Sequence, residues 1–375
     1  MAKTKDPAKR IGILTAGSDA PGMNAAIRAV GKAAGSYGME VIGFQDGFQG
    51  LIEDQVARPS LSGILPFGGT VLGTSREILE ETTGKGKDGG RVEKIIATFK
   101  RRALDVLVCI GGRDTQENAY LLQRKGLNVI TLPKGIDNGL AMTDVTIGFD
   151  TALGTATDAI DRLHSTASSH HRIIVIEIMG RNTGWLTLGA GISGGADVII
   201  IPEIPYDVQK IADAILERNR SGRRFSIVAV SEGGISKDTV EFFERSKQIN
   251  KINREGQEQV QVEQKLTEIE SRLTGNTIYL ANRLEKFTGL ETRITILGHL
   301  LRGGAPSASD RVLATSLGTA CVKMISEGTA GVMVSMRDGD VVPVPLEQVV
   351  GKPKQIPLNH PWIESARKVG TSLGD

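Results

Sequence analysis

Short apolar runs alternate with helix-like segments along this chain, and most of the runs end in a polar turn rich in glycine. The first run, RIGILT at residues 10–15, leads into the turn TAGSDAPGMN and then into an amphipathic helical pattern over residues 24–36. Near-continuous apolar runs separated by helices are typical of parallel strands buried on both faces of a sheet. The pattern therefore predicts an α/β protein with doubly wound parallel sheets.

The same pattern recurs to the end of the chain. Further strands are predicted over residues 39–44, 106–110, 129–132, 172–178, 196–201, 225–230 and 332–336. The carboxyl ends of parallel strands share one edge of a sheet, and ligands of such sheets bind in the loops at that edge. We therefore expect the functional residues to follow these runs.

Composition narrows the class of protein. The 375 residues allow about two domains of ordinary size. With 45 Lys and Arg against 43 Asp and Glu, the net charge of +2 argues against a nucleic-acid partner. A polar N-terminus and the lack of a long apolar run predict a cytoplasmic protein without a membrane partner. Cys109 and Cys321 lie in apolar patterns and are expected to be small buried hydrophobes.

Glycine is the most over-represented residue, at 46 of 375, or about 12% against about 7% in average proteins. Glycines stand in three turns that follow strands, at residues 15–24, 111–115 and 132–139. Exposed backbone N–H groups in such turns bind phosphates. The second half adds arginines after strand ends, a residue type whose guanidinium matches phosphate oxygens. Together these features favour a polyanionic, phosphate-bearing ligand.

Four phrases carry a resemblance to the 6-phosphofructokinase family. They read TAGSDAPGMN, PKGIDNG, EIMGR and LGHLLRGGAP, and the likeness extends from about residue 11 to the C-terminus. The closing phrases DRVLAT and HPWIESARKVGTSLGD look closest to the branch found in photosynthetic bacteria. The resemblance implies phosphoryl transfer to the 1-hydroxyl of fructose 6-phosphate. It also implies two α/β domains with the active site between them, and a homotetramer.

Residue roles follow from the same resemblance. Asp137 matches the general base that takes the proton of the sugar hydroxyl, and Arg76 and Arg181 match residues at the transferred phosphate. The implied sugar-phosphate residues are Arg172, Met179, Gly180, Arg181, Glu232, Arg293, His299 and Arg302. One arginine of the pair Arg172 and Arg293 is implied to come from the neighbouring subunit. The implied residues for the donor phosphate are Gly17, Ser18, Gly111, Gly112, Arg113, Asp114, Thr115 and Lys134.

The donor side departs from the family pattern at four positions. Ser18 replaces a glycine, Arg113 replaces the aspartate associated with Mg²⁺, and Gly135 and Gly139 replace a threonine and an aspartate. Mg²⁺ prefers carboxylate and phosphate oxygens, so its site is weakened and Asp114 is the remaining candidate ligand. Asp114 and Lys134 together point toward pyrophosphate as donor, but Lys134 also occurs in ATP-type relatives, and both donors stay open.

Two functions are compatible with this pattern. The chain is an active 6-phosphofructokinase, or it is a weak or silent member that binds fructose 6-phosphate as a sensor or regulatory subunit. The predicted donor domain is residues 1–148 plus about 301–352, and the sugar domain is residues 149–300 plus about 353–375. A polar helical insertion is predicted over residues 242–273, at the surface or a subunit contact. Arg28 and Lys32 match basic positions of an effector phosphate site.

Overall fold

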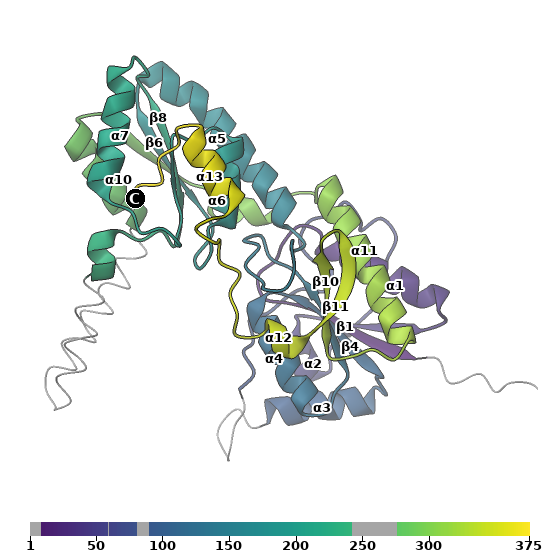
Figure 1. The fold of residues 1–375 in the computed structure, drawn as a ribbon. Coiled ribbons are helices and arrows are strands. Elements are labelled where there is room, and N and C mark those ends of the chain that lie inside the picture. The colour runs from purple at the N-terminus through teal and green to yellow at the C-terminus, as the bar shows by residue number, and fades with distance from the viewer. Residues whose placement is uncertain (1–8, 59, 81–89, 242–275) are drawn as a thin grey trace, which may run out of the picture. The chain divides into compact units, whose positions relative to one another are not determined.

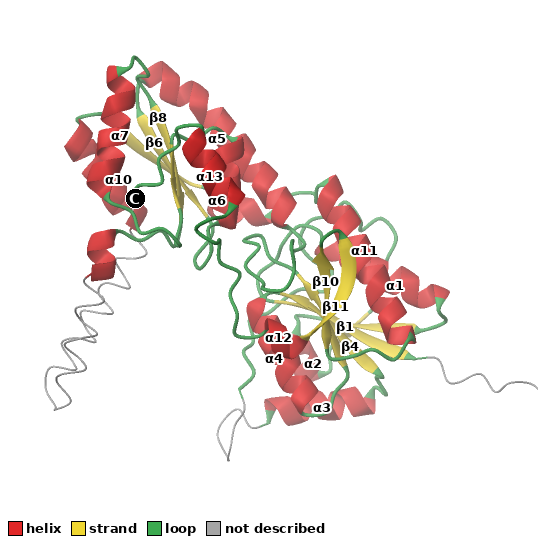
Figure 2. Ribbon diagram, in the orientation of Figure 1, coloured by secondary structure: helices red, strands yellow, loops and turns green. Residues whose placement is uncertain are grey.

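The computed structural model describes residues 9–58, 60–80, 90–241 and 276–375. It divides into two compact units, and each contains two stretches of the chain. Unit 1 comprises Met1–Ala152 and Arg302–Lys354, and unit 2 comprises Leu153–Leu301 and Gln355–Asp375. Each unit has its own sheet with helices packed against it (Figures 1 and 2). The predicted insertion at residues 242–273 falls outside the described residues.

Unit 1 is built on a seven-stranded sheet with the strand order β11-β10-β5-β4-β1-β2-β3. Its strands are β1 (Arg10–Ala16), β2 (Glu40–Phe44), β3 (Val56–Ala57), β4 (Val106–Gly111), β5 (Val129–Pro133), β10 (Val332–Arg337) and β11 (Asp340–Pro345). The chain moves from β1 to β2 on one side and to β4 on the other. The neighbouring strands β1 and β4 thus form the point at which the winding direction reverses, where α/β sheets bind ligands.

Helices cover both faces of this sheet. One face packs against α1 (Met23–Ser36) and α11 (Ala308–Ser326), through residues such as Ile11, Val108 and Ile110. The other face packs against α2 (Phe48–Glu53), α3 (Arg91–Arg101), α4 (Arg113–Arg124) and α12 (Leu346–Val349). Alternate residues of β4 enter the two cores, because successive strand side chains point to opposite faces. Both faces are buried, which is why the strands read as continuous apolar runs.

Unit 2 has an all-parallel four-stranded sheet with the order β7-β8-β6-β9. Its strands are β6 (Ile173–Ile178), β7 (Val198–Ile200), β8 (Ser226–Ser231) and β9 (Thr292–Ile296). The helices α7 (Val208–Arg220) and α10 (Asn276–Thr288) pack on one face. Figure 2 shows α5 (Phe149–His170), α6 (Trp185–Ser193) and α13 (Pro361–Lys368) on the other side of the strands.

The α/β prediction is confirmed, but the sheet of unit 1 is mixed rather than wholly parallel. β3 pairs antiparallel with β2, and β11 pairs antiparallel with β10. The β10–β11 connection is the two-residue turn Asp338-Gly339, with φ of 52° and 86°. Two residues suffice for an antiparallel hairpin, whereas a parallel connection needs about a dozen or more. The Asp-Gly pair is typical of such a hairpin, but no strand was predicted over residues 340–345, so the antiparallel edge strand β11 was missed.

Both cysteines are buried, as predicted, and neither is in a disulfide. Among the described residues, none of the helices combines the length and the apolar character that crossing a membrane requires.

Candidate functional site

Three turns of unit 1 meet because the register of three neighbouring strands places their last residues side by side. Ala16 of β1 pairs with Gly111 of β4, and Gly111 pairs with Pro133 of β5. The next residues along the chain are Gly17, Gly112 and Lys134. The structure therefore brings the three predicted phosphate turns together at one edge of the sheet. We call this group of turns, residues 17–22, 112–115 and 134–139, the donor-edge turns.

Lys134 lies at the centre of the donor-edge turns. Its side chain is buried, and its Nζ donates a hydrogen bond to the carbonyl oxygen of Ser18. Burial lowers the pKa of the ammonium to about 8, and the nearby charges that act on it are Asp137, Arg302, Asp19 and Arg76. A buried cation surrounded by these groups is suited to binding an anion that replaces its lost hydration.

The first turn is held by the segment that carries Arg76. The N–H of Gly17 donates to the carbonyl of Ser75 at 2.8 Å, and the Thr74 hydroxyl donates to the carbonyl of Gly17 at 2.7 Å. Arg76 Nη2 then donates to Ser18 Oγ at 3.2 Å. Gly17 has φ of 81°, which favours glycine. A Cβ there would stand 3.5 Å from Lys134 Nζ. Ser18 therefore contacts two cationic side chains: its hydroxyl binds Arg76 and its carbonyl binds Lys134.

The second turn forms the start of a helix. Gly112 is the N-cap of α4, and Arg113 and Asp114 are its first residues, with their side chains about half exposed. The guanidinium and carboxylate of these two residues lie 3.8 Å apart. Thr115 is buried against Gly111, where any Cβ would stand 2.1 Å from the threonine hydroxyl. Free N–H groups at a helix start favour an anion, and Arg113 adds positive charge there.

The third turn carries the predicted base. The N–H of Gly135 donates to the carbonyl of Ile147 at 3.0 Å, and Thr146 Oγ donates to the carbonyl of Gly135. A Cβ on Gly135 would lie 3.0 Å from Asp137 Oδ1. The Asp137 carboxylate therefore occupies the space next to Gly135 that a threonine side chain would need.

The carboxylates of unit 1 do not form a preassembled metal site. Across the described part of the chain, the structure brings no three His, Cys, Asp or Glu side chains together as a metal-binding group. Asp114, the predicted ligand, is about half exposed and its nearest ionic partner is Arg113. Mg²⁺ is usually held by one or two carboxylates together with the phosphates of the substrate, so the predicted ligand Asp114 would act together with the phosphates of the donor.

A second group of predicted residues gathers in unit 2, at the carboxyl edge of its sheet. Met179, Gly180 and Arg181 follow β6, Glu232 follows β8 and His299 follows β9. The N–H of Glu232 donates to the carbonyl of Ile178 at 2.9 Å, so the β6 and β8 loops are tied together. The structure brings these five residues to one edge, as expected for residues that share a ligand.

Arg172 and Arg293 lie at the other edge of the same sheet. Arg172 immediately precedes β6, and Arg293 pairs with Ile174 near the start of β9. Six residues of strand separate Arg172 from Ile178, or roughly 20 Å at about 3.3 Å per residue. A sugar phosphate is much smaller than this distance. Within one chain, the structure therefore does not bring the two arginines to the other predicted sugar residues of unit 2.

Glu291 joins these two arginines, and the sequence analysis missed it. Arg172 Nε lies 2.6 Å from Glu291 Oε2, and Arg293 Nη2 bonds to Glu291 Oε1. Arg172 and Arg293 hold the pKa of the carboxyl below its usual range, chiefly through the Arg172 hydrogen bond. Glu291 directly precedes β9 and lies two residues before Arg293, and this spacing of opposite charges beside a strand was the sequence signal for the contact.

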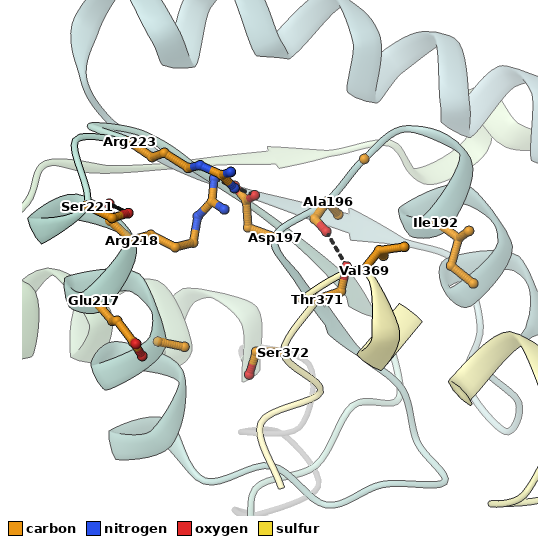
Figure 3. Close-up of a pocket in the computed structure, with 13 residues that line it drawn as sticks. Ile192, Ala196, Asp197, Glu217, Arg218, Ser221, Arg223, Val369, Thr371 and Ser372 are labelled. Carbon is orange, nitrogen blue, oxygen red and sulfur yellow. Dashed lines mark hydrogen bonds and ion pairs between the residues drawn. The ribbon is translucent and has the colours of Figure 1, made fainter. Parts of the chain in front are cut away.

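Unit 2 also has a cavity of about 600 Å³ that the sequence analysis did not single out (Figure 3). It lies beside the starts of β7 and β8, and its lining includes Asp197, Arg218 and Arg223. Arg218 Nη2 bonds to Asp197 Oδ1 at 2.6 Å, and the N–H of Ile227 donates to Asp197 Oδ2 at 2.9 Å. Burial raises the pKa of Asp197 despite these partners.

Comparison with known proteins identifies the relatives of this chain. The sequence profile described as phosphofructokinase matches residues 10–325. The ATP-dependent 6-phosphofructokinase of Propionibacterium freudenreichii subsp. shermanii is 51% identical over 374 residues, which are 98% of this chain and 99% of that protein.

Solved structures agree with this match. Phosphofructokinase from Pichia pastoris in the T-state aligns with a TM-score of 0.75 and 30% identity, over 93% of this chain and 36% of that chain. This chain thus spans about a third of the Pichia chain. The pyrophosphate-dependent phosphofructokinase from Marinobacter aquaeolei aligns with a TM-score of 0.75 and 20% identity, over 98% of this chain and 92% of that chain. At that identity, the second alignment shows a shared fold alone.

Proposed function

The chain belongs to the phosphofructokinase family, and we propose that it transfers the terminal phosphoryl group of ATP to the 1-hydroxyl of fructose 6-phosphate. The observation that carries the proposal is the meeting of the donor-edge turns around buried Lys134, with Asp137 and Arg76 among the charges that act on it. ATP is preferred over pyrophosphate because the 51% identical relative is named ATP-dependent. Pyrophosphate remains the alternative donor.

The proposed chemistry needs a base and positive charge. Asp137 accepts the proton of the sugar 1-hydroxyl while that oxygen forms a bond to the terminal phosphorus, and the bond from phosphorus to ADP breaks. Lys134, Arg76 and the start of α4 neutralise the charge that develops on the phosphoryl oxygens. The products are fructose 1,6-bisphosphate and ADP, and Asp137 returns the proton to solvent.

For the sugar, we propose binding by the loops at the carboxyl edge of unit 2, which carry Arg181. The distance of Arg172 and Arg293 from that edge supports a second copy of the chain as their source. Because both bind Glu291, we assign them to the neighbouring subunit as a pair, rather than one of them as the resemblance implies. A homotetramer, the two-domain division of donor and sugar, and a cytoplasmic location stay predictions.

An assay with Mg²⁺ tests the function. Formation of fructose 1,6-bisphosphate is measured with ATP and, separately, with pyrophosphate. Turnover of about 1–100 per second with ATP would support the proposal. Asp137→Asn is expected to lower kcat by about 10²- to 10⁴-fold. The matched control is Asp158→Asn, an exposed carboxylate on α5 that pairs with Arg162. Equal activity of the Asp137 variant and the wild type would refute the role of the base.

A silent, sugar-binding protein is the second candidate. The four departures from the family pattern on the donor side favour this candidate, among them Arg113, which lies beside Asp114. Fructose 6-phosphate binding without turnover on either donor would favour this candidate. Arg113→Asp, Gly135→Thr and Gly139→Asp together are then expected to raise activity. The threonine has to displace the Asp137 carboxylate, which lies 3.0 Å from the new Cβ.

Regulation by an effector also stays a prediction. Arg28 and Lys32 lie four residues apart on α1, where Arg28 is half-buried and Lys32 is exposed. This spacing places both side chains on one side of the helix, as a shared phosphate requires.

A further inference from the structure

Asp310, the first residue of the phrase DRVLAT, is a buried carboxylate to which neither the resemblance nor the proposed chemistry gives a role. It is 1% exposed and lies in the first turn of α11. Its Oδ1 accepts the N–H of Gly148 at 2.8 Å. Its Oδ2 accepts the N–H of Thr151 at 2.8 Å and the Thr151 hydroxyl at 2.5 Å. Three hydrogen bonds therefore join the start of α11 to the start of α5.

Ser307, the N-cap of α11, also bonds to residues at the start of α5. Its N–H donates to Thr151 Oγ at 2.9 Å, and its hydroxyl donates to Asp150 Oδ2 at 2.6 Å. The Ser307 hydroxyl also accepts the N–H of Asp310 at 3.1 Å, as the N-cap of α11. Each helix start thus supplies side chains that bind the backbone of the other, a more rigid arrangement than a single cap.

The start of α5 is continuous with the strand-like segment that supports the third donor-edge turn. The N–H of Ile147 donates to the carbonyl of Pro133 at 3.0 Å, and the carbonyl of Ile147 accepts the N–H of Gly135 at 3.0 Å. These two bonds flank Lys134. Gly148, the next residue after Ile147, donates its N–H to Asp310. The carboxylate is therefore one peptide away from the backbone that fixes Lys134.

The first donor-edge turn rests on the same place. A Cβ on Gly22 would lie 2.7 Å from Ile147 Cγ2 and 3.7 Å from Asp310 Cβ. A Cβ on Gly148 would lie 2.8 Å from the Cβ of Ala20. Both glycines have positive φ, at 96° and 101°, so the close approach depends on glycine. Movement of Gly148 would therefore disturb the first and third turns together.

We propose that Asp310 is a positioning residue for phosphoryl transfer: its carboxylate fixes Gly148 and Ile147, and through them the turn that carries Lys134 and Asp137. The inference rests on the proposed function. Phosphoryl transfer depends on positioning, and a misplacement of about 1 Å distant from the reacting atoms costs about 100-fold in rate. The expected signature is loss of kcat, because the hydrogen-bond partners of this carboxylate, Gly148 and Thr151, lead to the turn that carries Lys134 and Asp137.

The test compares variants that break the connection with variants that keep it. Asp310→Asn replaces one acceptor oxygen with an NH₂ group that faces an N–H donor. Thr151→Val removes only the hydroxyl bonds, and Thr151→Ser retains them. We expect kcat to fall about 10- to 100-fold in Asp310→Asn and less in Thr151→Val. KM for fructose 6-phosphate should stay within about twofold. Thr151→Ser should have wild-type kcat.

The control for simple destabilisation is Asp207→Ala in unit 2, because alanine removes the N-cap acceptor. Asp207 is the N-cap of α7 and accepts the N–H of Gln209 at 2.8 Å. This variant loses a carboxylate cap without any bond to the donor-edge turns. It is expected to lower Tm and leave kcat unchanged. If Asp310→Asn and Thr151→Val also lower Tm and leave kcat unchanged, Asp310 is only a stabilising residue and the proposal is overturned.

Hydrogen exchange separates this inference from the proposed function. In Asp310→Asn, amide exchange in residues 133–149 should become faster, while exchange in β4 stays at the wild-type rate. This readout does not require activity, so it decides the positioning role even if the wild type forms no fructose 1,6-bisphosphate. If Asp310→Asn does not fold, the comparison of Thr151→Val with Thr151→Ser gives the same decision. Unchanged exchange in residues 133–149 would overturn the proposal.

Discussion

Replacing Lys134 by methionine should stabilise the protein at pH 7 while removing most of its catalytic rate. The side chain is 3% exposed, and its Nζ bonds to the carbonyl of Ser18. Burial lowers its pKa from 10.5 to about 8, although the Asp137 and Asp19 carboxylates favour the charged form. The folded protein therefore keeps a cation in a place where its environment disfavours the charge. A methionine side chain has nearly the same length and carries no charge.

The magnitude follows from the pKa. A fall from 10.5 to about 8 corresponds to about 3 kcal/mol, at about 1.4 kcal/mol for each factor of ten. Against this, the carbonyl of Ser18 loses its ammonium donor, which costs about 1 kcal/mol for a group that is partly exposed. The expected net effect of Lys134→Met is thus a gain of about 2 kcal/mol in the free energy of unfolding at pH 7.

The gain should depend on pH with a definite sign. Below pH 8, Lys134 is charged in the folded and unfolded states, and the full destabilisation is present. Between pH 8 and pH 10.5, the folded protein releases the proton while the unfolded chain keeps it, so wild-type stability rises with pH. Lys134→Met lacks this rise. The advantage of the variant should therefore be largest near pH 7 and shrink toward pH 10.

Urea unfolding at pH 7 and pH 10 measures the stability, and the coupled kinase assay measures kcat. Loss of the ammonium is expected to lower kcat by about 10²- to 10³-fold. The matched control is Lys354→Met, since burial also lowers the pKa of Lys354 to about 8, and its Nζ donates to the carbonyl of Asp144. That variant should keep wild-type activity. A Lys134→Met protein less stable than the wild type at pH 7 would refute the reasoning.

Two further predictions concern charge and burial. Glu291→Gln should tighten the binding of fructose 6-phosphate several-fold in a titration at low salt. The exposed ion pairs of Glu291 contribute little, whereas its carboxylate repels a phosphate dianion beside Arg172 and Arg293. Weaker binding would show that orientation of the arginines dominates. Burial raises the pKa of Cys321 to about 12 and raises that of Cys109 further. Neither thiol should therefore react with iodoacetamide at pH 8 until urea unfolds the protein. Mass spectrometry of the native protein should show no labelling.

The α/β architecture and the three glycine-rich turns could be predicted from the sequence. Continuous apolar runs are a consequence of burial on both faces, and strands that are joined through helices pair in parallel, as the strands of unit 1 do except for β3 and β11 at its edges. Glycine-rich turns after β1, β4 and β5 were predicted to meet, and the register of Ala16, Gly111 and Pro133 confirms it. Local patterns suffice here because a strand, a turn and a helix each depend on neighbouring residues.

Which charged side chains come together could be seen only in the folded protein. The buried ammonium of Lys134 bonds to the carbonyl of Ser18, which is 116 residues away in the chain. Asp310 reaches Gly148 across 162 residues, and Glu291 reaches Arg172 across 119. Single residues at such separations leave no periodic signal, because burial and hydrogen bonding arise only when distant segments pack. For the same reason, the sequence could predict a binding role for Arg172 and Gly180 without revealing that one chain holds them at opposite edges of a sheet.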